Sequence, residues 1–136
     1  MDFVKIDVEG FEPRVLDGMK RVTEAMKPVV YMEFNSWALA SNSVAHMPFL
    51  QQLISEYGFF VYRDRATGMP VFVKTVGETR TFLHDNMIRN GCVDDIVFSL
   101  DGEKIRNLAG KMDHPGSPLR HPMMVGLPPE KWSSLK

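Results

Sequence analysis

The sequence has little of several features that identify a class of protein at once. Cys92 is the only cysteine, so the chain forms no internal disulfide, and a lone thiol is typical of a reducing compartment. No apolar run approaches the about 20 residues that a membrane-spanning helix needs. Residues 1–5 lack the basic segment and apolar core of a signal peptide. We therefore expect a cytoplasmic protein with no membrane partner.

An excess of charge of one sign is also missing. Sixteen basic and seventeen acidic residues give a formal net charge of −1, and Lys and Arg form no local run. Nucleic-acid binding normally needs a basic surface, so we expect no nucleic-acid partner. The hydrophobic fraction of 44% is that of an ordinary globular domain.

A glycine-rich turn for a nucleotide-like cofactor is absent as well. Gly10, Gly18 and Gly58 are isolated, and no G-x-G-x-x-G pattern occurs. Such a turn lets the backbone approach the cofactor closely at the start of a helix. The sequence therefore contains no recognisable cofactor-binding turn.

What the sequence does contain is an alternation of β-favouring segments with helical patterns. The expected strands are residues 3–6, 29–32, 59–62, 71–73 and 95–100. One expected helix begins at Glu12, ends before Pro28 and carries an apolar stripe of Val15, Met19, Val22 and Met26. The other expected helices span residues 43–57 and 79–90.

This order predicts an α/β fold with helices on the faces of one sheet. Strands that alternate with helices imply a mainly parallel sheet with right-handed crossovers. A hairpin of residues 59–62 with 71–73 and the last strand would form an antiparallel end. We expect one domain over residues 1–112. Residues 113–136 hold five of the nine prolines and show no periodicity, which predicts an extended tail.

Acidic residues follow the first two expected strands. Asp7 and Glu9 come after residues 3–6, and Glu33 comes after residues 29–32. In open α/β sheets ligands bind beyond the carboxyl ends of strands, so neighbouring strands would bring these groups into a common crevice. Close carboxylates can shift each other's pKa, hold a divalent cation or act as a general base. Acidic residues after strands also cap helices, and the residues alone leave both interpretations open.

The same segments carry a resemblance to a known family. Residues 3–12, followed by residues 15–18, resemble the K-I-D-V-E-G-x-E stretch and V-L-x-G helix of FkbM-type methyltransferases. Residues 28–35 resemble the family's next strand, which ends in Glu and often Asn. Residues 57–62 and 95–98 are similar to its later strands.

This resemblance implies a partial Rossmann-like, class I methyltransferase sheet. It implies transfer of a methyl group from S-adenosylmethionine to an oxygen of a sugar or other small molecule. Asp7 would end the fourth strand of that sheet and Glu33 the fifth, so these two are the expected catalytic residues, as a base or as metal ligands. Glu9, Asn35 and Trp37 are the expected residues of the acceptor site.

The missing glycine-rich turn leads to expectations about the activity of the chain and about its assembly. We expect the chain to be the C-terminal part of a methyltransferase domain, without the cofactor-binding half and inactive alone. In the class I sheet the fourth strand lies beside the first, so residues 3–7 would form an open edge that a homodimer or larger assembly covers. Two alternatives remain: a non-catalytic module that oligomerises through this strand, and a metal-dependent hydrolase that uses Asp7, Glu9 and Glu33.

Overall fold

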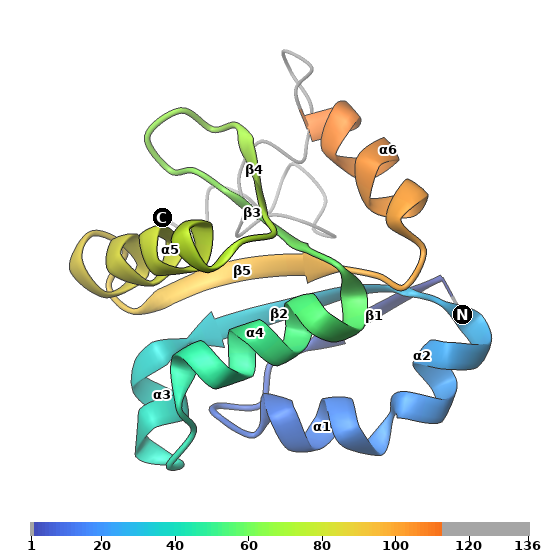
Figure 1. Ribbon diagram of the computed structural model, residues 1–136, viewed down its shortest axis with the longest axis horizontal. Helices are drawn as coiled ribbons and strands as arrows, with labels where there is room; N and C mark the ends of the chain where they lie inside the picture. The colour runs from blue at the N-terminus through green and yellow to red at the C-terminus, as the bar shows by residue number, and fades with distance from the viewer. Residues whose placement is uncertain (1, 113–136) are drawn as a thin grey trace, which may run out of the picture.

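The computed structural model describes residues 2–112, so the expected tail of residues 113–136 lies outside the described part of the chain (Figure 1). The strands are β1 Phe3–Ile6, β2 Val29–Asn35, β3 Phe60–Arg63, β4 Pro70–Val73 and β5 Val93–Phe98. The helices are α1 Glu12–Gly18, α2 Lys20–Met26, α3 Ser36–Ser41, α4 His46–Tyr57, α5 Val76–Ile88 and α6 Gly102–Met112. Among the described residues, no helix is both long and apolar enough to cross a lipid bilayer.

The five strands form one mixed sheet in the order β1-β2-β5-β3-β4. β1 pairs with β2 in parallel, whereas β5 runs antiparallel to both β2 and β3, and β3 and β4 form the expected antiparallel hairpin. The expectation of a mainly parallel sheet is therefore wrong, because three of the four pairings are antiparallel. β1, β2 and β3 do share one direction, but β5 lies between β2 and β3 and separates them.

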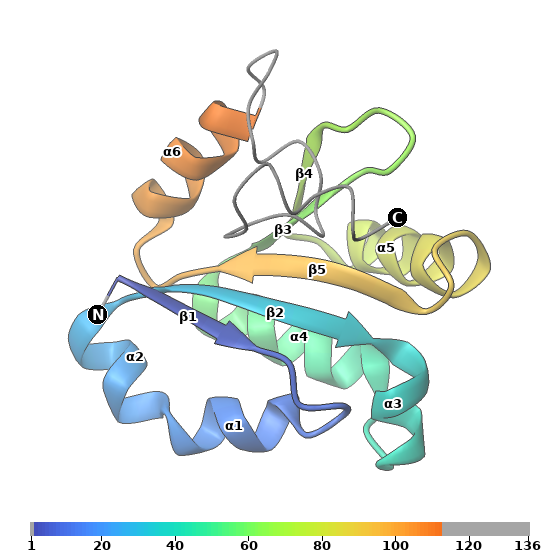
Figure 2. The same ribbon diagram turned by 180° about the vertical axis from the view of Figure 1, so that it is seen from behind.

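One face of the sheet carries the main core. Alternate residues of the strands point to this face, as the period of two requires, and are fully buried; they are Ile6, Met32, Phe34, Phe60 and Ile96. Leu50 and Leu53 of α4 pack against them, and Figure 2 shows α4 lying across β2. The Phe82 ring of α5 contacts the rings of Phe34 and Phe60, each with a centroid distance of 5.2 Å.

The second face is covered by a helix over part of its area only. Ile105 of α6 is 1% exposed and packs with Phe59 and Val61. α6 is a helix that was not expected, although Ile105, Leu108 and Ala109 have helical spacing. Polar side chains, including Glu33 and Asp95, lie elsewhere on this face.

Three further expectations about helices need correction. The helix expected from Glu12 to Pro28 is interrupted at Met19, between α1 and α2. The interruption changes the direction of α2 relative to α1, so Thr23 faces the protein interior instead of Val22 and Met26. Val22 and Met26 are 38% and 47% exposed. The loop expected after β2 contains α3, and α4 begins at His46 rather than residue 43.

Candidate functional site

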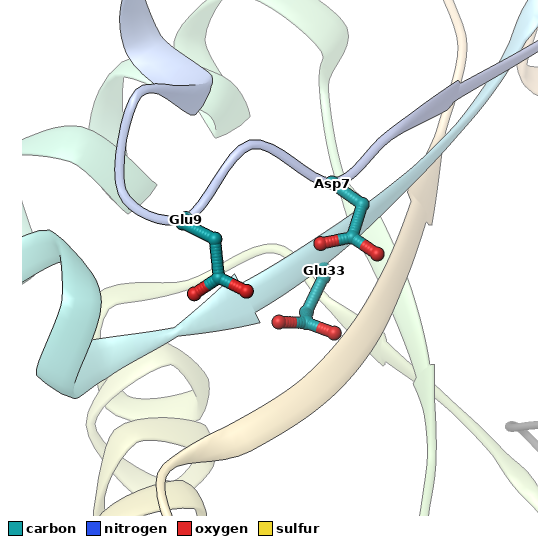
Figure 3. Close-up of side chains that lie close together, drawn as sticks. All are labelled: Asp7, Glu9 and Glu33. Atoms are coloured by element: carbon teal, nitrogen blue, oxygen red, sulfur yellow. The ribbon is translucent and has the colours of Figure 1, made fainter.

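Three acidic side chains meet at the carboxyl ends of the parallel pair β1 and β2 (Figure 3). The register pairs Ile6 with Met32, so the next residues along each strand, Asp7 and Glu33, lie side by side. Glu9 reaches the same place from the loop after β1. One carboxylate oxygen from each of the three lies within 4.8 Å of the others. The three side chains expected to lie close together do so, and we call Asp7, Glu9 and Glu33 the acidic cluster.

Glu33 differs from the other two members in its surroundings. It lies inside β2 rather than after it, because β2 continues to Asn35 by pairing with β5. Its side chain is half-buried, whereas Asp7 and Glu9 are exposed. Burial raises the pKa of the Glu33 carboxyl above its ordinary value, and the negative charges of Asp7 and Asp95 raise this pKa further. Glu33 is therefore the member best suited to accept a proton.

Asp95 is a neighbour of the acidic cluster that the sequence analysis did not identify. It is the register partner of Glu33 on β5. Burial raises the pKa of Asp95, and the hydrogen bond from the Tyr31 hydroxyl and the charge of Lys5 act in the opposite direction. Burial and the neighbouring Asp95 also raise the pKa of Tyr31. No local signal marks Asp95, because its proximity depends on strand pairing across more than 60 residues of chain.

The adjacent Asp94 belongs to a structural network on the other face of the sheet. It is 4% exposed and accepts hydrogen bonds from the side-chain amides of Asn86, at 2.8 Å, and Asn90, at 3.0 Å. Arg65 Nε lies 3.5 Å from its carboxylate. Burial raises the pKa of Asp94, and these partners lower it. Asp94 therefore ties the end of α5 to β5 and does not face the cluster.

The other two expected acceptor-site residues lie at the junction of β2 and α3. The Asn35 side-chain oxygen accepts a hydrogen bond from the backbone N–H of Ala38 at 3.0 Å and so caps α3. Trp37, in the first turn of α3, is 71% exposed. Its ring is free to contact a ligand, while the Asn35 oxygen already has a structural task.

A hollow of about 460 Å³ opens on the second face of the sheet, next to α6. Its wall is mainly apolar and includes Val29, Val97, Ile105 and Leu108. Tyr31 and Asp95 also line it, and Asp95 is the cross-strand neighbour of Glu33. The hollow therefore lies on the face that carries Glu33, and its lining residue Asp95 is next to the acidic cluster on the neighbouring strand.

Three converging carboxylates can do two kinds of chemistry. They can attract a positively charged group or a divalent cation, for which carboxylate oxygens are suitable ligands. They can also take a proton from a bound hydroxyl group, most readily through Glu33. The contact of Lys5 Nζ with Asp7 Oδ2, at 3.8 Å between two exposed groups, neutralises little of this negative charge.

Comparison with known families identifies the segment that carries the cluster. Residues 1–61 match the family described as the methyltransferase FkbM domain. The match confirms the resemblance over these residues, which include the acidic cluster, Asn35 and Trp37. It indicates a methyltransferase. Residues 95–98, which also resemble the family, lie outside the match. No curated protein and no solved structure matches the chain significantly.

Proposed function

We propose that this chain forms the acceptor side of an S-adenosylmethionine-dependent methyl transfer to an oxygen of a sugar or other small molecule. One observation carries the proposal. The carboxylates of Asp7, Glu9 and Glu33 converge at the carboxyl ends of two parallel strands, within the segment that matches the methyltransferase family. The carboxyl ends of the strands are the usual place of ligand sites in open α/β sheets.

The donor set of the cluster fits the reacting end of this cofactor. S-adenosylmethionine carries positive sulfonium and ammonium groups, which negatively charged carboxylates attract. Asp7 and Glu9, the exposed members, are the residues suited to hold those charges. When bound, the cofactor supplies the methyl group.

The residues of the chain have distinct tasks in this proposal. Glu33 accepts the hydroxyl proton of the acceptor at its carboxylate, which leaves the acceptor oxygen nucleophilic. Its raised pKa makes it a stronger base than an ordinary Glu. The exposed Trp37 ring stacks on the acceptor and helps to orient its hydroxyl, because alignment of the reacting atoms supplies much of the rate.

Binding measurements test the proposal directly. Because the sequence contains no glycine-rich cofactor-binding turn, binding of S-adenosylmethionine and S-adenosylhomocysteine to the 136-residue chain in calorimetry, with a dissociation constant in the micromolar range, equivalent to about −8 kcal/mol, would show that the chain forms its cofactor site by other means, for example across a dimer. A panel of sugars and hydroxylated small molecules then identifies the acceptor through release of S-adenosylhomocysteine. Absence of binding at millimolar cofactor would remove the activity from this chain, and an assembly role would replace it.

Variants of the cluster separate the roles of its members. We expect Glu33→Gln to keep cofactor binding within about threefold and to slow methyl transfer by about 10²-fold or more, because the general base is lost. Asp7→Asn should weaken cofactor binding instead. Glu24→Gln, which changes an exposed carboxylate of α2, is the matched control and should alter neither. Equal rates for Glu33→Gln and the unchanged chain would remove Glu33 from the mechanism.

A divalent cation in the acidic cluster is the second candidate, and the spacing of the three carboxylates favours it. The cation would bind the acceptor oxygen and lower the pKa of its hydroxyl. A metal-dependent hydrolase would use the same ligands. A rise in melting temperature with millimolar Mg²⁺ or Mn²⁺ that disappears in Asp7→Asn would favour this candidate; no rise would exclude it.

We also propose that the chain forms a homodimer through β1. Within the described part of the chain β1 pairs only with β2, so its other side is an open sheet edge. Phe3 on this strand is 50% exposed. Open edges with apolar side chains pair readily with a second strand, and a two-fold axis would place β1 against its own copy.

A further inference from the structure

The loop that carries two of the three cluster carboxylates has an unfavourable backbone conformation. Residues 7–10 belong to the segment that connects β1 to α1 and include Asp7 and Glu9. Glu9 has a φ of 55° and Gly10 a φ of 95°. A non-glycine residue with positive φ persists only where its surroundings hold it there. Contacts of this loop therefore decide where the Glu9 carboxylate points.

The first contact comes from Glu12, at the start of α1. Glu12 is 1% exposed. Its Oε1 accepts hydrogen bonds from the backbone N–H groups of Val8 and Gly10, each at 3.3 Å. These two groups flank Glu9, so one buried carboxylate fixes the backbone on both sides of it. Glu12 Oε2 has no hydrogen-bond partner within residues 2–112.

The second contact comes from α3, on the opposite side of the loop. Asn42 Nδ2 donates to the carbonyl oxygens of Glu9, at 3.2 Å, and Ala38, at 2.9 Å. Gly10 lies so close to α3 that a Cβ atom on it would be 2.4 Å from the Ala38 oxygen. Because α3 follows directly from β2, these contacts attach the loop to the strand that carries Glu33.

We propose that Glu12 is a positioning residue that holds the loop of residues 7–10 against α3 and thereby sets the spacing of Asp7 and Glu9 from Glu33. Its importance for methyl transfer rests on the proposed function. Its effect on the loop does not, so the two parts are tested by separate measurements.

Two substitutions that remove the same charge isolate the hydrogen bonds. Glu12→Gln keeps a side-chain oxygen able to accept from Val8 and Gly10, whereas Glu12→Ala keeps none. Native-state amide hydrogen exchange, measured by NMR on the full chain, reports both N–H groups individually. We expect Glu12→Ala to speed exchange at Val8 and Gly10 by about tenfold or more relative to Glu12→Gln, which stays near the unchanged chain. Amides of β5 serve as the internal reference and should exchange equally in both variants.

The outcomes are distinct. Equal exchange at Val8 and Gly10 in the two variants overturns the proposal, and so does an equal acceleration at the β5 amides, which would mean general destabilisation. Where the chain transfers methyl groups, Glu12→Ala should also lower kcat by about tenfold or more, with Glu12→Gln restoring it. Where the unchanged chain shows no transfer, the proposed function fails while the exchange result still decides whether Glu12 holds the loop.

Discussion

At the scale of single residues, Glu33 is a strand residue with two negatively charged neighbours. Asp95 faces it across the β2–β5 pairing, and Asp7 lies beside it, one residue after the end of β1. Like charges directly opposite each other in a sheet are destabilising. The native state is therefore less stable than it would be with an uncharged side chain at position 33.

This unfavourable interaction predicts a pH-dependent effect of Glu33→Gln. The folded-state pKa of Glu33 lies above its ordinary value of 4.5. The protonated, neutral Glu33 avoids the repulsion, so its contribution to stability is complete below pH 4.5 and is lost as pH rises through the folded-state pKa. Gln stays neutral throughout. We expect Glu33→Gln to match the unchanged chain at low pH and to be about 0.5 kcal/mol more stable at pH 7, or about 2 °C in melting temperature.

Thermal melts across this pH range check the prediction. Glu24→Gln is the control, because its exposed carboxylate should produce no such trend. A Glu33→Gln variant less stable than the unchanged chain at pH 7 would show that the carboxylate makes a favourable contact instead.

Only part of the site was predictable from local sequence. Asp7 and Glu33 were expected to meet because the carboxyl ends of parallel neighbours lie together, and they do. Asp95 was not expected, since its position depends on β5 pairing with β2. The burial of Glu12 was not expected either, because a Glu at the start of a helix is usually exposed.

At the scale of elements, helices with local signals were predicted better than helices defined by packing. The end of α4 at Tyr57, before Gly58, agrees with the helix expected over residues 43–57. α3 was missed because its six residues show no full apolar period, although Asn35 is a suitable N-cap. The interruption at Met19 was missed because Val22 and Met26 continue the apolar spacing of α1.

The N-terminus of α5 permits a test of one such local signal. Thr75 Oγ1 accepts from the Glu78 N–H at 3.1 Å, and Glu78 Oε2 accepts from the Thr75 N–H at 3.0 Å. We expect Thr75→Ala to cost about 1 kcal/mol of unfolding free energy in urea denaturation, since this capping box is lost. Thr81→Ala, on the exposed face of the same helix, should change stability by less than about 0.5 kcal/mol. Equal effects would mean that the cap contributes nothing.

The contact between Gly10 and α3 predicts a larger effect. An added Cβ at position 10 would overlap the Ala38 oxygen in a backbone region that L-residues avoid. We expect Gly10→Ala to lower the free energy of unfolding by about 1–3 kcal/mol. Gly110→Ala is the opposite case, because, apart from its own stretch of helix, no atom of residues 2–112 lies within 4 Å of its added Cβ in α6, and it should gain about 0.5–1 kcal/mol. Denaturation curves that rank the two variants in the reverse order would contradict the described contact.

At the scale of the whole molecule, the sheet has two unlike faces and an open edge. One face is closed by α1, α4 and α5. Figure 2 shows α6 on the other side of the sheet from α4, and the hollow and Glu33 lie on that second face. The alternation of strands and helices predicted the α/β arrangement, but the strand order did not follow from it. Which distant strands pair depends on the total packing of the core and not on any single segment.

The open edge of β1 leads to a prediction about assembly. We expect sedimentation to show a concentration-dependent dimer. Phe3→Lys should weaken it by about tenfold or more, equivalent to about 1.4 kcal/mol, because Lys on an edge strand opposes pairing. Phe11→Lys changes another exposed aromatic residue, 44% exposed in the loop before α1, and should leave the dimer unchanged. A chain that remains monomeric at all concentrations would contradict the dimer proposal.

The position of β5 has a consequence for synthesis on the ribosome. The β1–β2 pair and the β3–β4 hairpin are adjacent to β5 on either side and share no pairing with each other. A nascent chain that ends before Val93 therefore contains two separate ribbons and no strand to join them. Since chains grow from the N-terminus, the sheet closes only after residues 93–98 have been made, and closure then brings together segments more than 60 residues apart. Until that moment the backbone groups of β2 and β3 that pair with β5 have no strand partner from it.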